Sequence, residues 1–237
     1  MKGVIAMRFS SPLIPGTLLK RYKRFLADVR LDDDTLVTAH CTNTGRMLGC
    51  SAPGSRIYLS DQSGKGRKLE FTWEIIRVGT SLVGINTLAA NRLTREGIEG
   101  GVIRELQGYE NLRAEVPTRP GTRLDFLLES PTEHCYVEVK NVTLMIDHVA
   151  AFPDAVSERG TKHLKELIRL RRKGHRAVLM FVIQRGRCLS IRPADEIDPE
   201  YGRWLRRAVK AGVEIYSYSS QVTTRAISLK DAVPLLL

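Results

Sequence analysis

The sequence contains few cysteines, and none of them forms a recognisable metal-binding or redox motif. Among the four there is no C-x-x-C pair. The nearest approach to a zinc site, His40 and Cys41 with Cys50, offers at most three ligands at irregular spacing, whereas a structural zinc needs two close pairs. We therefore expect reduced, mostly buried thiols and no structural zinc. The four are Cys41, Cys50, Cys135 and Cys188.

Long hydrophobic runs, internal repeats and low-complexity tracts are absent as well. No apolar run approaches the roughly 20 residues that span a bilayer. The apolar stretch at residues 3–7 ends at Arg8, which makes it too short for the core of a signal peptide. We therefore expect a folded cytoplasmic protein that does not associate with a membrane.

The sequence does have an excess of positive charge. Its 237 residues include 37 Lys and Arg against 26 Asp and Glu, a formal net charge of +11. Residues 1–90 contain 13 basic and 7 acidic residues, and residues 91–237 contain 24 and 19, so the excess is +6 and +5. Such a charge favours a polyanionic partner, nucleic acid first and an anionic membrane second. The membrane is disfavoured because no basic amphipathic helix carries an exposed aromatic face.

The first third of the chain has the pattern of a small β-barrel. Several short β-rich runs are separated by turn residues, in fewer than ninety positions. Five short strands of this kind are typical of the OB-fold, which commonly binds oligonucleotides. We therefore predict an OB-like five-stranded barrel over residues 1–86. The runs are 18–31, 35–41, 56–60, 69–78 and 82–86.

From residue 87 onward helices and strands alternate. A helix at 160–173 has the clearest pattern, with Gly174 at its expected C-terminal cap, and the apolar run 177–183 is typical of a strand buried on both faces. The pattern predicts a mixed sheet with flanking helices, and hence an α+β chain whose second domain covers residues 87–237. The other expected elements are helices at 87–96 and 199–211, a short turn at 102–106, and strands at 112–116, 124–128, 135–142 and 213–218.

Asp125 and the segment Glu138-Val139-Lys140 are the residues with the clearest chemical meaning. Side chains alternate along a strand, so Glu138 and Lys140 share one face while Val139 points to the other. If the strand of Asp125 lies alongside, two carboxylates converge and can bind Mg²⁺ or Mn²⁺ through oxygen ligands. Such a site suits phosphodiester hydrolysis, with Lys140 orienting the attacking water or stabilising developing negative charge. The alternative is an ordinary exposed strand face with a Glu–Lys salt bridge.

These three residues resemble the D…(D/E)-x-K signature of the restriction-endonuclease-like nucleases, although Leu124 stands where the fuller signature has proline. The resemblance implies an α/β nuclease core with Asp125, Glu138 and Lys140 as catalytic residues and the two carboxylates as metal ligands. It also implies accessory residues on the first helix and on the helix after the E-x-K strand. Those candidates are Glu96, with Glu115 close behind it, and Lys162.

Motifs spread along the chain resemble one family more closely. They are KRYKRFLADV (20–29), HCTNTGRM (40–47), NTL (86–88), RLDF (123–126), EVK (138–140) and FPDAVSERGTKHL (152–164). This pattern is similar to the sugar fermentation stimulation protein A family over essentially the whole chain after residue 10. Thr42 and Thr161 depart from it. The resemblance implies an OB-like domain, a nuclease-like domain, and DNA binding with little sequence preference.

Two basic segments are candidates for nucleic-acid contact. Cations and aromatics alternate at residues 20–25, where Tyr22 is expected to stack on a base and Phe25 to face the core. A basic stripe on the 160–173 helix is either a solvated face or a phosphate track. His40 and His163 are assigned to packing or hydrogen bonding, because a lone histidine more often does this than catalyse. The predicted contact residues are Lys20, Arg21, Tyr22, Arg24, Arg46, Lys165, Arg169 and Arg172.

Two functions fit these observations. The first is a DNA-binding protein with a metal-dependent nuclease site, acting on single- or double-stranded DNA and possibly also RNA. The second is a DNA-binding regulator without catalytic activity, linked to sugar metabolism by the family resemblance, that keeps the nuclease fold as a binding platform. The sequence does not distinguish them, and it leaves the oligomeric state open.

Overall fold

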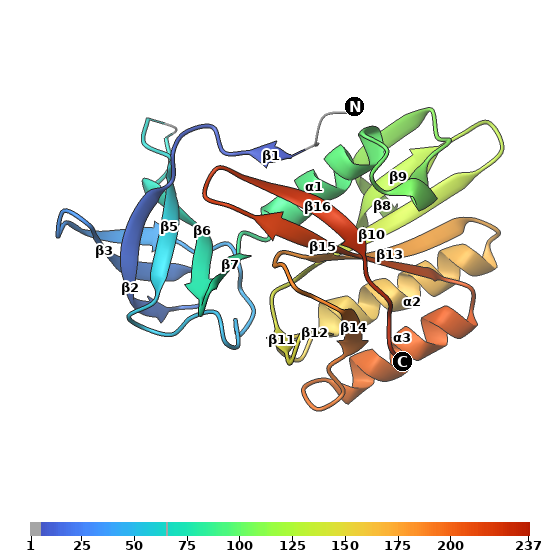
Figure 1. Ribbon diagram of the computed structural model, residues 1–237. Coiled ribbons are helices and arrows are strands. Elements are labelled where there is room, and N and C mark those ends of the chain that lie inside the picture. Colours follow the sequence, from blue (N-terminus) through green and yellow to red (C-terminus); the bar gives the residue numbers. More distant parts are fainter. Residues whose placement is uncertain (1–5, 65) are drawn as a thin grey trace.

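The protein, described by a computed structural model over residues 6–64 and 66–237, has a barrel at one end and a mixed sheet with helices at the other (Figure 1). Of the apolar stretch 3–7, only Ala6 and Met7 lie within the described residues. Within this part of the chain, no helix is both long and apolar enough to cross a membrane.

The N-terminal part is a closed five-stranded barrel, as predicted. Antiparallel pairing joins β2 to β3 and β5, β3 to β4, and β5 to β6, and a parallel contact between β4 and β6 closes the circle. Trp73 and Leu18 are fully buried in its core. The single run predicted at 18–31 is two strands joined by a tight turn at 23–25. The five barrel strands are β2 (Ile14–Tyr22), β3 (Leu26–Leu31), β4 (Leu36–His40), β5 (Arg56–Asp61) and β6 (Phe71–Val78), and β7 (Ser81–Gly84) pairs with β6 beside them.

The C-terminal part contains a seven-stranded mixed sheet in the order β1-β16-β15-β13-β10-β9-β8. β13 lies at its centre, and every residue after Arg176 is buried, as the continuous apolar run predicts. A separate sheet has the order β11-β12-β14. The first sheet comprises β1 (Met7–Arg8), β8 (Asn111–Arg119), β9 (Thr122–Glu129), β10 (His134–Val142), β13 (Arg176–Ile183), β15 (Glu214–Val222) and β16 (Ala226–Ala232), and the second β11 (Met145–Ile146), β12 (Val149–Phe152) and β14 (Ser190–Pro193).

Helices cover both faces of the large sheet (Figure 1). α1 (Leu88–Glu99) packs on one face through Ala90 and Leu93, and a short 3₁₀ turn, η1 (Arg104–Leu106), follows it. α2 (Glu158–Arg172) and α3 (Pro199–Lys210) share the core on the other face. The Ser157 hydroxyl caps α2 by accepting a hydrogen bond from the Gly160 N–H, and the Asp198 carboxylate caps α3. Gly174 has φ +89° just after α2, where the sequence places the cap glycine.

β1 is the main departure from the predicted division of the chain. Met7 and Arg8, which the sequence groups with the barrel, pair antiparallel with Ile227 and Ala226 of β16. Met7 is buried in the core of the C-terminal sheet. A two-residue strand is too short to be detected from alternation, so this pairing has no clear sequence signal. The strands β11, β12, β14 and β16 were also not predicted.

Side-chain and backbone contacts fix the barrel against the C-terminal domain. The Met47 N–H in the 42–50 loop donates to Asp154 Oδ2 at 2.8 Å, although these residues are 107 positions apart. A second contact lies where the barrel ends, since Gly84 N donates to Gln184 O and Gln184 Nε2 donates to Asn86 O. These contacts hold one end of the barrel close to the large sheet.

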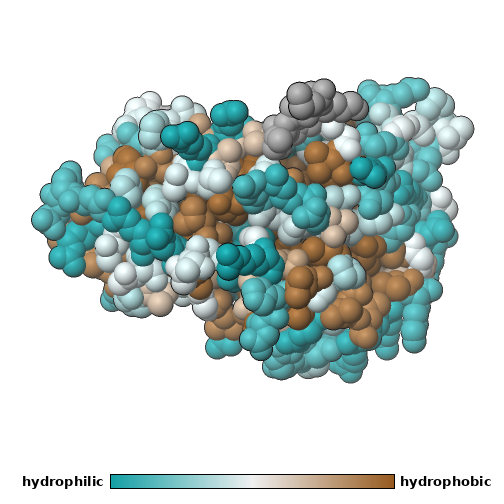
Figure 2. All heavy atoms as spheres, viewed as in Figure 1, coloured by the Kyte–Doolittle hydropathy of each residue, from teal (hydrophilic) through white to brown (hydrophobic). Residues whose placement is uncertain are grey.

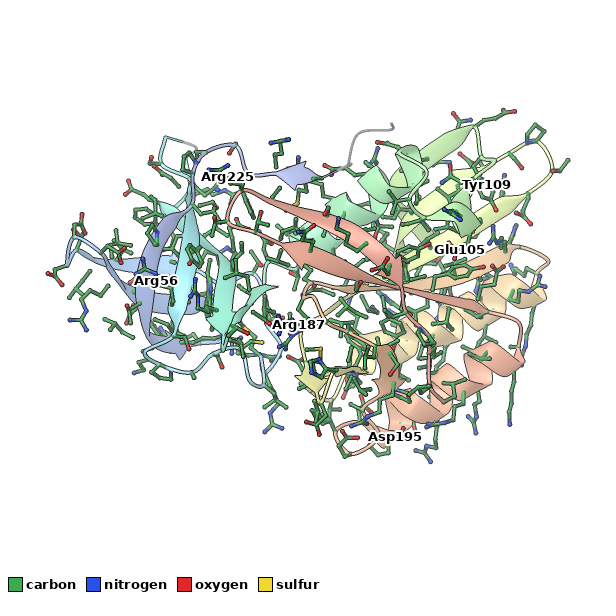
Figure 3. All side chains as sticks on the ribbon, viewed as in Figure 1. Arg56, Glu105, Tyr109, Arg187, Asp195 and Arg225 are labelled. Atoms are coloured by element: carbon green, nitrogen blue, oxygen red, sulfur yellow. The ribbon has the colours of Figure 1, made fainter. Side chains whose placement is uncertain are left out.

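Arg187 and Arg225 lie on the barrel side of the C-terminal domain, whereas Glu105 and Tyr109 lie at its opposite end (Figure 3). In the view of Figure 2, hydrophobic residues gather over the lower part of this domain. There the C-terminal segment bridges to β14, and Leu189 and Leu236 are exposed.

Candidate functional site: a carboxylate–lysine centre beside the barrel

β9 and β10 bring the three predicted catalytic residues together. The two strands pair as far as Phe126 and Val137, and the next positions along are Asp125 and Glu138. Beyond that point the Val139 N–H donates to Asp125 Oδ2 at 2.7 Å, so a side chain takes the place of a strand partner. Val137 and Val139 enter the core on the α1 face, and Glu138 and Lys140 project on the other side, as strand alternation predicts.

Glu138 is a buried carboxylate with two cationic or polar partners on one of its oxygens. Lys140 Nζ lies 2.5 Å from Glu138 Oε1, and His163 Nδ1 of α2 makes a very close contact with the same oxygen. The other oxygen, Glu138 Oε2, is buried and has no hydrogen-bond partner. Burial raises the pKa of Glu138, but Lys140 and His163 outweigh it and hold that pKa below its ordinary value.

Asp125 accepts a hydrogen bond on each of its two carboxylate oxygens. Asn91 of α1 donates its Nδ2–H to Asp125 Oδ1 at 2.8 Å, opposite the backbone bond from Val139. Burial, and then the nearby Glu138 carboxylate, raise the pKa of Asp125 to about 6. The two neighbouring carboxylates therefore repel each other in the absence of a cation.

This donor set fits a hard divalent cation. Asp125 and Glu138 supply carboxylate oxygens, and Glu138 Oε2 is free of protein partners. Mg²⁺ characteristically binds one or two protein carboxylates and keeps several waters. Across residues 6–64 and 66–237 no group of three or more His, Cys, Asp and Glu side chains is arranged to hold a metal.

The three accessory candidates do not join Asp125, Glu138 and Lys140. Glu96 pairs with Arg92 on the outside of α1, and the α1 residue that contacts Asp125 is Asn91. Glu115 lies on β8 in a left-handed conformation, φ +54°, and is exposed beside Arg123. Lys162 Nζ donates to the Gly121 carbonyl at 2.7 Å, which ties α2 to the β8–β9 turn.

Two recesses flank the carboxylate–lysine centre formed by Asp125, Glu138 and Lys140, called the centre below. One is a basic pocket of about 770 Å³ between α2 and the β8–β9 hairpin, lined by His163 together with Arg119, Arg123, Arg159 and Lys162. The other is a cleft of about 450 Å³ between barrel and sheet. Lys140 and Asn91 line its sheet side, and Arg24 and Asn43 its barrel side. Arg159 lines both recesses.

Some of the predicted nucleic-acid contact residues of the barrel are bonded within the barrel, and others face the cleft or solvent. Arg21 is structural, because its guanidinium donates to the carbonyls of Arg24, Asn43 and Gly45 and so holds the 42–50 loop. Tyr22 donates its hydroxyl to Asp28 Oδ1, with Lys20 above its ring. Arg24 faces the cleft with its Nε bonded to the Thr44 carbonyl, and Arg46 is exposed nearby.

The residues of the basic stripe on α2 also differ in their surroundings. Arg169, together with Arg119 of β8, forms ion pairs with Glu166, a carboxylate that is fully buried on α2. Lys165 turns toward α3 and lies 4.5 Å from the centre of the Trp204 ring. Arg172 is exposed. The stripe therefore does not form one continuous phosphate track toward the centre.

Sequence reasoning missed Asn91 and did not connect His163 with the centre. His163 was assigned to packing or hydrogen bonding, and α2 places it in contact with Glu138 Oε1 and 3.4 Å from Lys140 Nζ. Asn91 follows the NTL segment by three residues on α1. Placing either residue requires the packing of α1 and α2 on opposite faces of the sheet, which helix periodicity alone does not give.

Comparisons with known proteins agree with this architecture. The family profile described as the SfsA N-terminal OB domain matches residues 19–85, and the sugar fermentation stimulation protein RE domain matches residues 88–226. A sugar fermentation stimulation protein homolog of Citrifermentans bemidjiense is 52% identical over 98% of this chain and 100% of its own length. One from Geobacter sulfurreducens is 54% identical over 95% and 97%.

A solved structure has the same fold throughout. It is described as "The structure of Pyrococcus Furiosus SfsA in complex with Ca2+", with 28% identity and a TM-score of 0.91 over 99% of both chains. With both family profiles matched in chain order, and with relatives this similar over nearly their whole length, the chain belongs to the sugar fermentation stimulation protein family.

Proposed function

We propose that this protein binds DNA with little sequence preference and hydrolyses phosphodiester bonds at Asp125, Glu138 and Lys140 with the help of Mg²⁺ or Mn²⁺. The observation that carries the proposal is the buried Glu138 oxygen without a partner, next to a second carboxylate of raised pKa. The relative from Pyrococcus furiosus is described in complex with Ca²⁺, an ion of the same oxygen-ligand chemistry. We place the activity in the cytoplasm, where DNA is available.

Asp125 and Glu138 would hold the ion, and His163 and Lys140 keep the Glu138 carboxylate in place. When bound, such an ion polarises a phosphoryl oxygen and lowers the pKa of an attacking water. The Lys140 ammonium, 13% exposed at the edge of the cleft, stabilises negative charge that develops on the phosphate. Arg159 and Lys162 bind the flanking phosphates in the basic pocket.

The test measures cleavage of end-labelled single- and double-stranded DNA and RNA in Mg²⁺, Mn²⁺ or EDTA. Asp125→Ala and Lys140→Ala are each expected to lower the rate by at least about 100-fold, the scale for losing one transition-state contact. Lys230→Ala, an exposed lysine on β16, is the matched control and should keep the full rate. If the wild-type protein cleaves no faster than Asp125→Ala on any substrate, the nuclease proposal is wrong.

Binding without cleavage would leave the regulatory function. One observation favours that alternative, namely that no group of three or more His, Cys, Asp and Glu side chains in the described chain is arranged to hold a metal, even though His163 contacts Glu138. Filter binding measures DNA binding independently of cleavage. In a series of rising salt, each phosphate contact on duplex DNA adds about −0.9 to the slope of log affinity against log salt concentration. A flat response would contradict both alternatives.

A further inference from the structure

Tyr201, in the first turn of α3, is fully buried, and its hydroxyl has no hydrogen-bond partner among residues 6–64 and 66–237. Its backbone is fixed, because its N–H donates to Asp198 Oδ1 at 2.9 Å. A buried hydroxyl without a partner destabilises a fold, and phenylalanine would fill the same space without that cost. The hydroxyl of Tyr201 is therefore expected to have a function.

The ring of Tyr201 belongs to an aromatic cluster beside the centre. Lys140 of β10 pairs with Phe181 of β13, which lies in the core between the sheet and the helices α2 and α3. The Phe181 ring is 5.5 Å from the Phe152 ring, and the Phe152 ring is 5.2 Å from that of Tyr201. Three packed rings thus connect the strand partner of Lys140 with Tyr201.

Within a single turn, α2 contacts both Tyr201 and Glu138. A Cβ added at Gly160 would lie 3.1 Å from Tyr201 Cε2, so the edge of the ring occupies the space of a side chain. Three residues later, His163 contacts Glu138 Oε1. Positions three apart on a helix share a face and are about 4.5 Å apart along its axis. The Tyr201 ring and the Glu138 carboxylate therefore pack against adjacent positions of one helix face.

Glu138 provides the acceptor that remains near this hydroxyl. Burial, and then the charges of Glu138 and Asp198, raise the pKa of Tyr201 well above its ordinary value, so both carboxylates lie near it. The two oxygens of Asp198 already accept the N–H groups of Tyr201 and Ser157. Glu138 Oε2 is buried and has no partner in the described chain. A donor and an acceptor, both buried and both unpaired, thus lie on neighbouring side chains.

We propose that Tyr201 is a positioning residue of the centre, and that its hydroxyl donates through one bound water to Glu138 Oε2 and orients this oxygen for a divalent cation. Buried waters typically bridge polar groups that otherwise have no partner. A carboxylate oxygen can accept such a hydrogen bond and bind a cation together, because it has more than one lone pair. The inference rests on the cation site of the proposed function and does not require cleavage.

The test measures the affinity for Mn²⁺ by isothermal titration calorimetry of the full chain, without nucleic acid. Tyr201→Phe removes only the hydroxyl and is expected to weaken Mn²⁺ binding about 10- to 100-fold, the scale for losing an outer partner of a metal-binding residue. Tyr218→Phe is the matched control. Its buried hydroxyl also donates to a carboxylate, Glu105 at 2.7 Å, which lies at the opposite end of the domain (Figure 3). This variant should keep the wild-type affinity.

Gly160→Ala separates positioning from packing. The added Cβ crowds the Tyr201 ring and the Ser157 hydroxyl, and it is expected to weaken Mn²⁺ binding when Tyr201 is present. In the Tyr201→Phe background the same change should have little further effect, because no hydroxyl is left to displace. The effect on Ser157 is common to both backgrounds and cancels in the comparison. Additive losses, or equal Mn²⁺ affinity for Tyr201→Phe and wild type, overturn the inference.

Cleavage assays distinguish this inference from the proposed function. If the wild type binds Mn²⁺ and cleaves no substrate, the proposed hydrolysis is wrong, and a weakened Mn²⁺ affinity of Tyr201→Phe still supports the inference. If the wild type cleaves and Tyr201→Phe binds Mn²⁺ equally well, the inference alone is wrong. A wild type that binds no Mn²⁺ contradicts both.

Discussion

His163 is a single buried side chain that contacts the Glu138 carboxylate of the centre. It contacts Glu138 on the oxygen that Lys140 also binds, and it is only 6% exposed. The outer partners of metal-binding residues fix their orientation, and replacing such a partner typically costs 10- to 100-fold in metal affinity or activity. Under the proposed function, His163 is a positioning residue that acts through Glu138 and Lys140.

We expect His163→Ala to lower the apparent metal affinity by about 10- to 100-fold. The loss should appear both in thermal stabilisation by Ca²⁺ and in Mg²⁺-dependent cleavage. The measurement is a metal titration followed by the melting temperature, together with cleavage rates at each concentration. His134→Ala, on the exposed surface of β10, is the control and should behave like the wild type. Unchanged metal affinity in His163→Ala would remove the histidine from the site.

At the scale of elements, the β8–β9 hairpin is anchored to α2 by one buried carboxylate. Glu166 is completely buried and pairs with Arg169 at 2.5 Å and Arg119 at 3.0 Å. Burial raises the pKa of Glu166, but the bonds from Arg169 and Thr118 and the charge of Arg119 outweigh it and lower that pKa below its ordinary value of 4.5. This anchor also supports the basic pocket beside the centre.

Glu166→Gln is expected to lower the free energy of unfolding by about 1–3 kcal/mol at pH 7, because two charge-assisted hydrogen bonds weaken while both arginines keep some solvent. A lowered carboxyl pKa stabilises the fold above the unfolded value and stops doing so as the pH falls through the folded value. The difference between variant and wild type, measured by urea unfolding, should therefore shrink below about pH 4.5. A difference that grows in acid would contradict this assignment.

The elements that sequence analysis predicted are those with long, regular patterns. β13 and α2 are readable because a continuous apolar run and a helical stripe survive whatever packs against them. Glu138 and Lys140 could be predicted for the same reason, since strand alternation alone puts them on one face. Phe25 was expected to face the core, but it is 45% exposed. The alternation of strand side chains was extended through the turn at 23–25, where it does not apply. The bonds from Arg21 to the Asn43 and Gly45 carbonyls could not be predicted, because only the tertiary fold brings that loop near.

For the whole molecule, the contact between the 42–50 loop and Asp154 links the two parts. Gly45 lies so close to Asp154 that a Cβ at this position would be 2.5 Å from Asp154 Oδ1. The carboxylate also accepts the Met47 N–H. The same loop lines the cleft with Asn43, so this contact positions the barrel side of the cleft relative to Lys140.

Asp154→Ala is expected to separate the unfolding of the barrel from that of the sheet domain and to cost about 1–3 kcal/mol. The two tryptophans report the parts separately, since Trp73 is buried in the barrel and Trp204 lies on α3. Trp73→Phe and Trp204→Phe backgrounds give one reporter each. We expect coincident transitions in the wild type and divergent ones in Asp154→Ala. Asp231→Ala, an exposed carboxylate on β16, should leave them coincident.

The pairing of β1 with β16 has a mechanical consequence. The described chain pairs with the large sheet at Met7, passes through the whole barrel, and returns to the sheet domain at α1. The barrel is therefore attached to the sheet domain at both of its chain ends rather than through a single linker. Together with the Met47–Asp154 contact, these two attachments hold Arg24 on the barrel side of the cleft at a set position relative to Lys140.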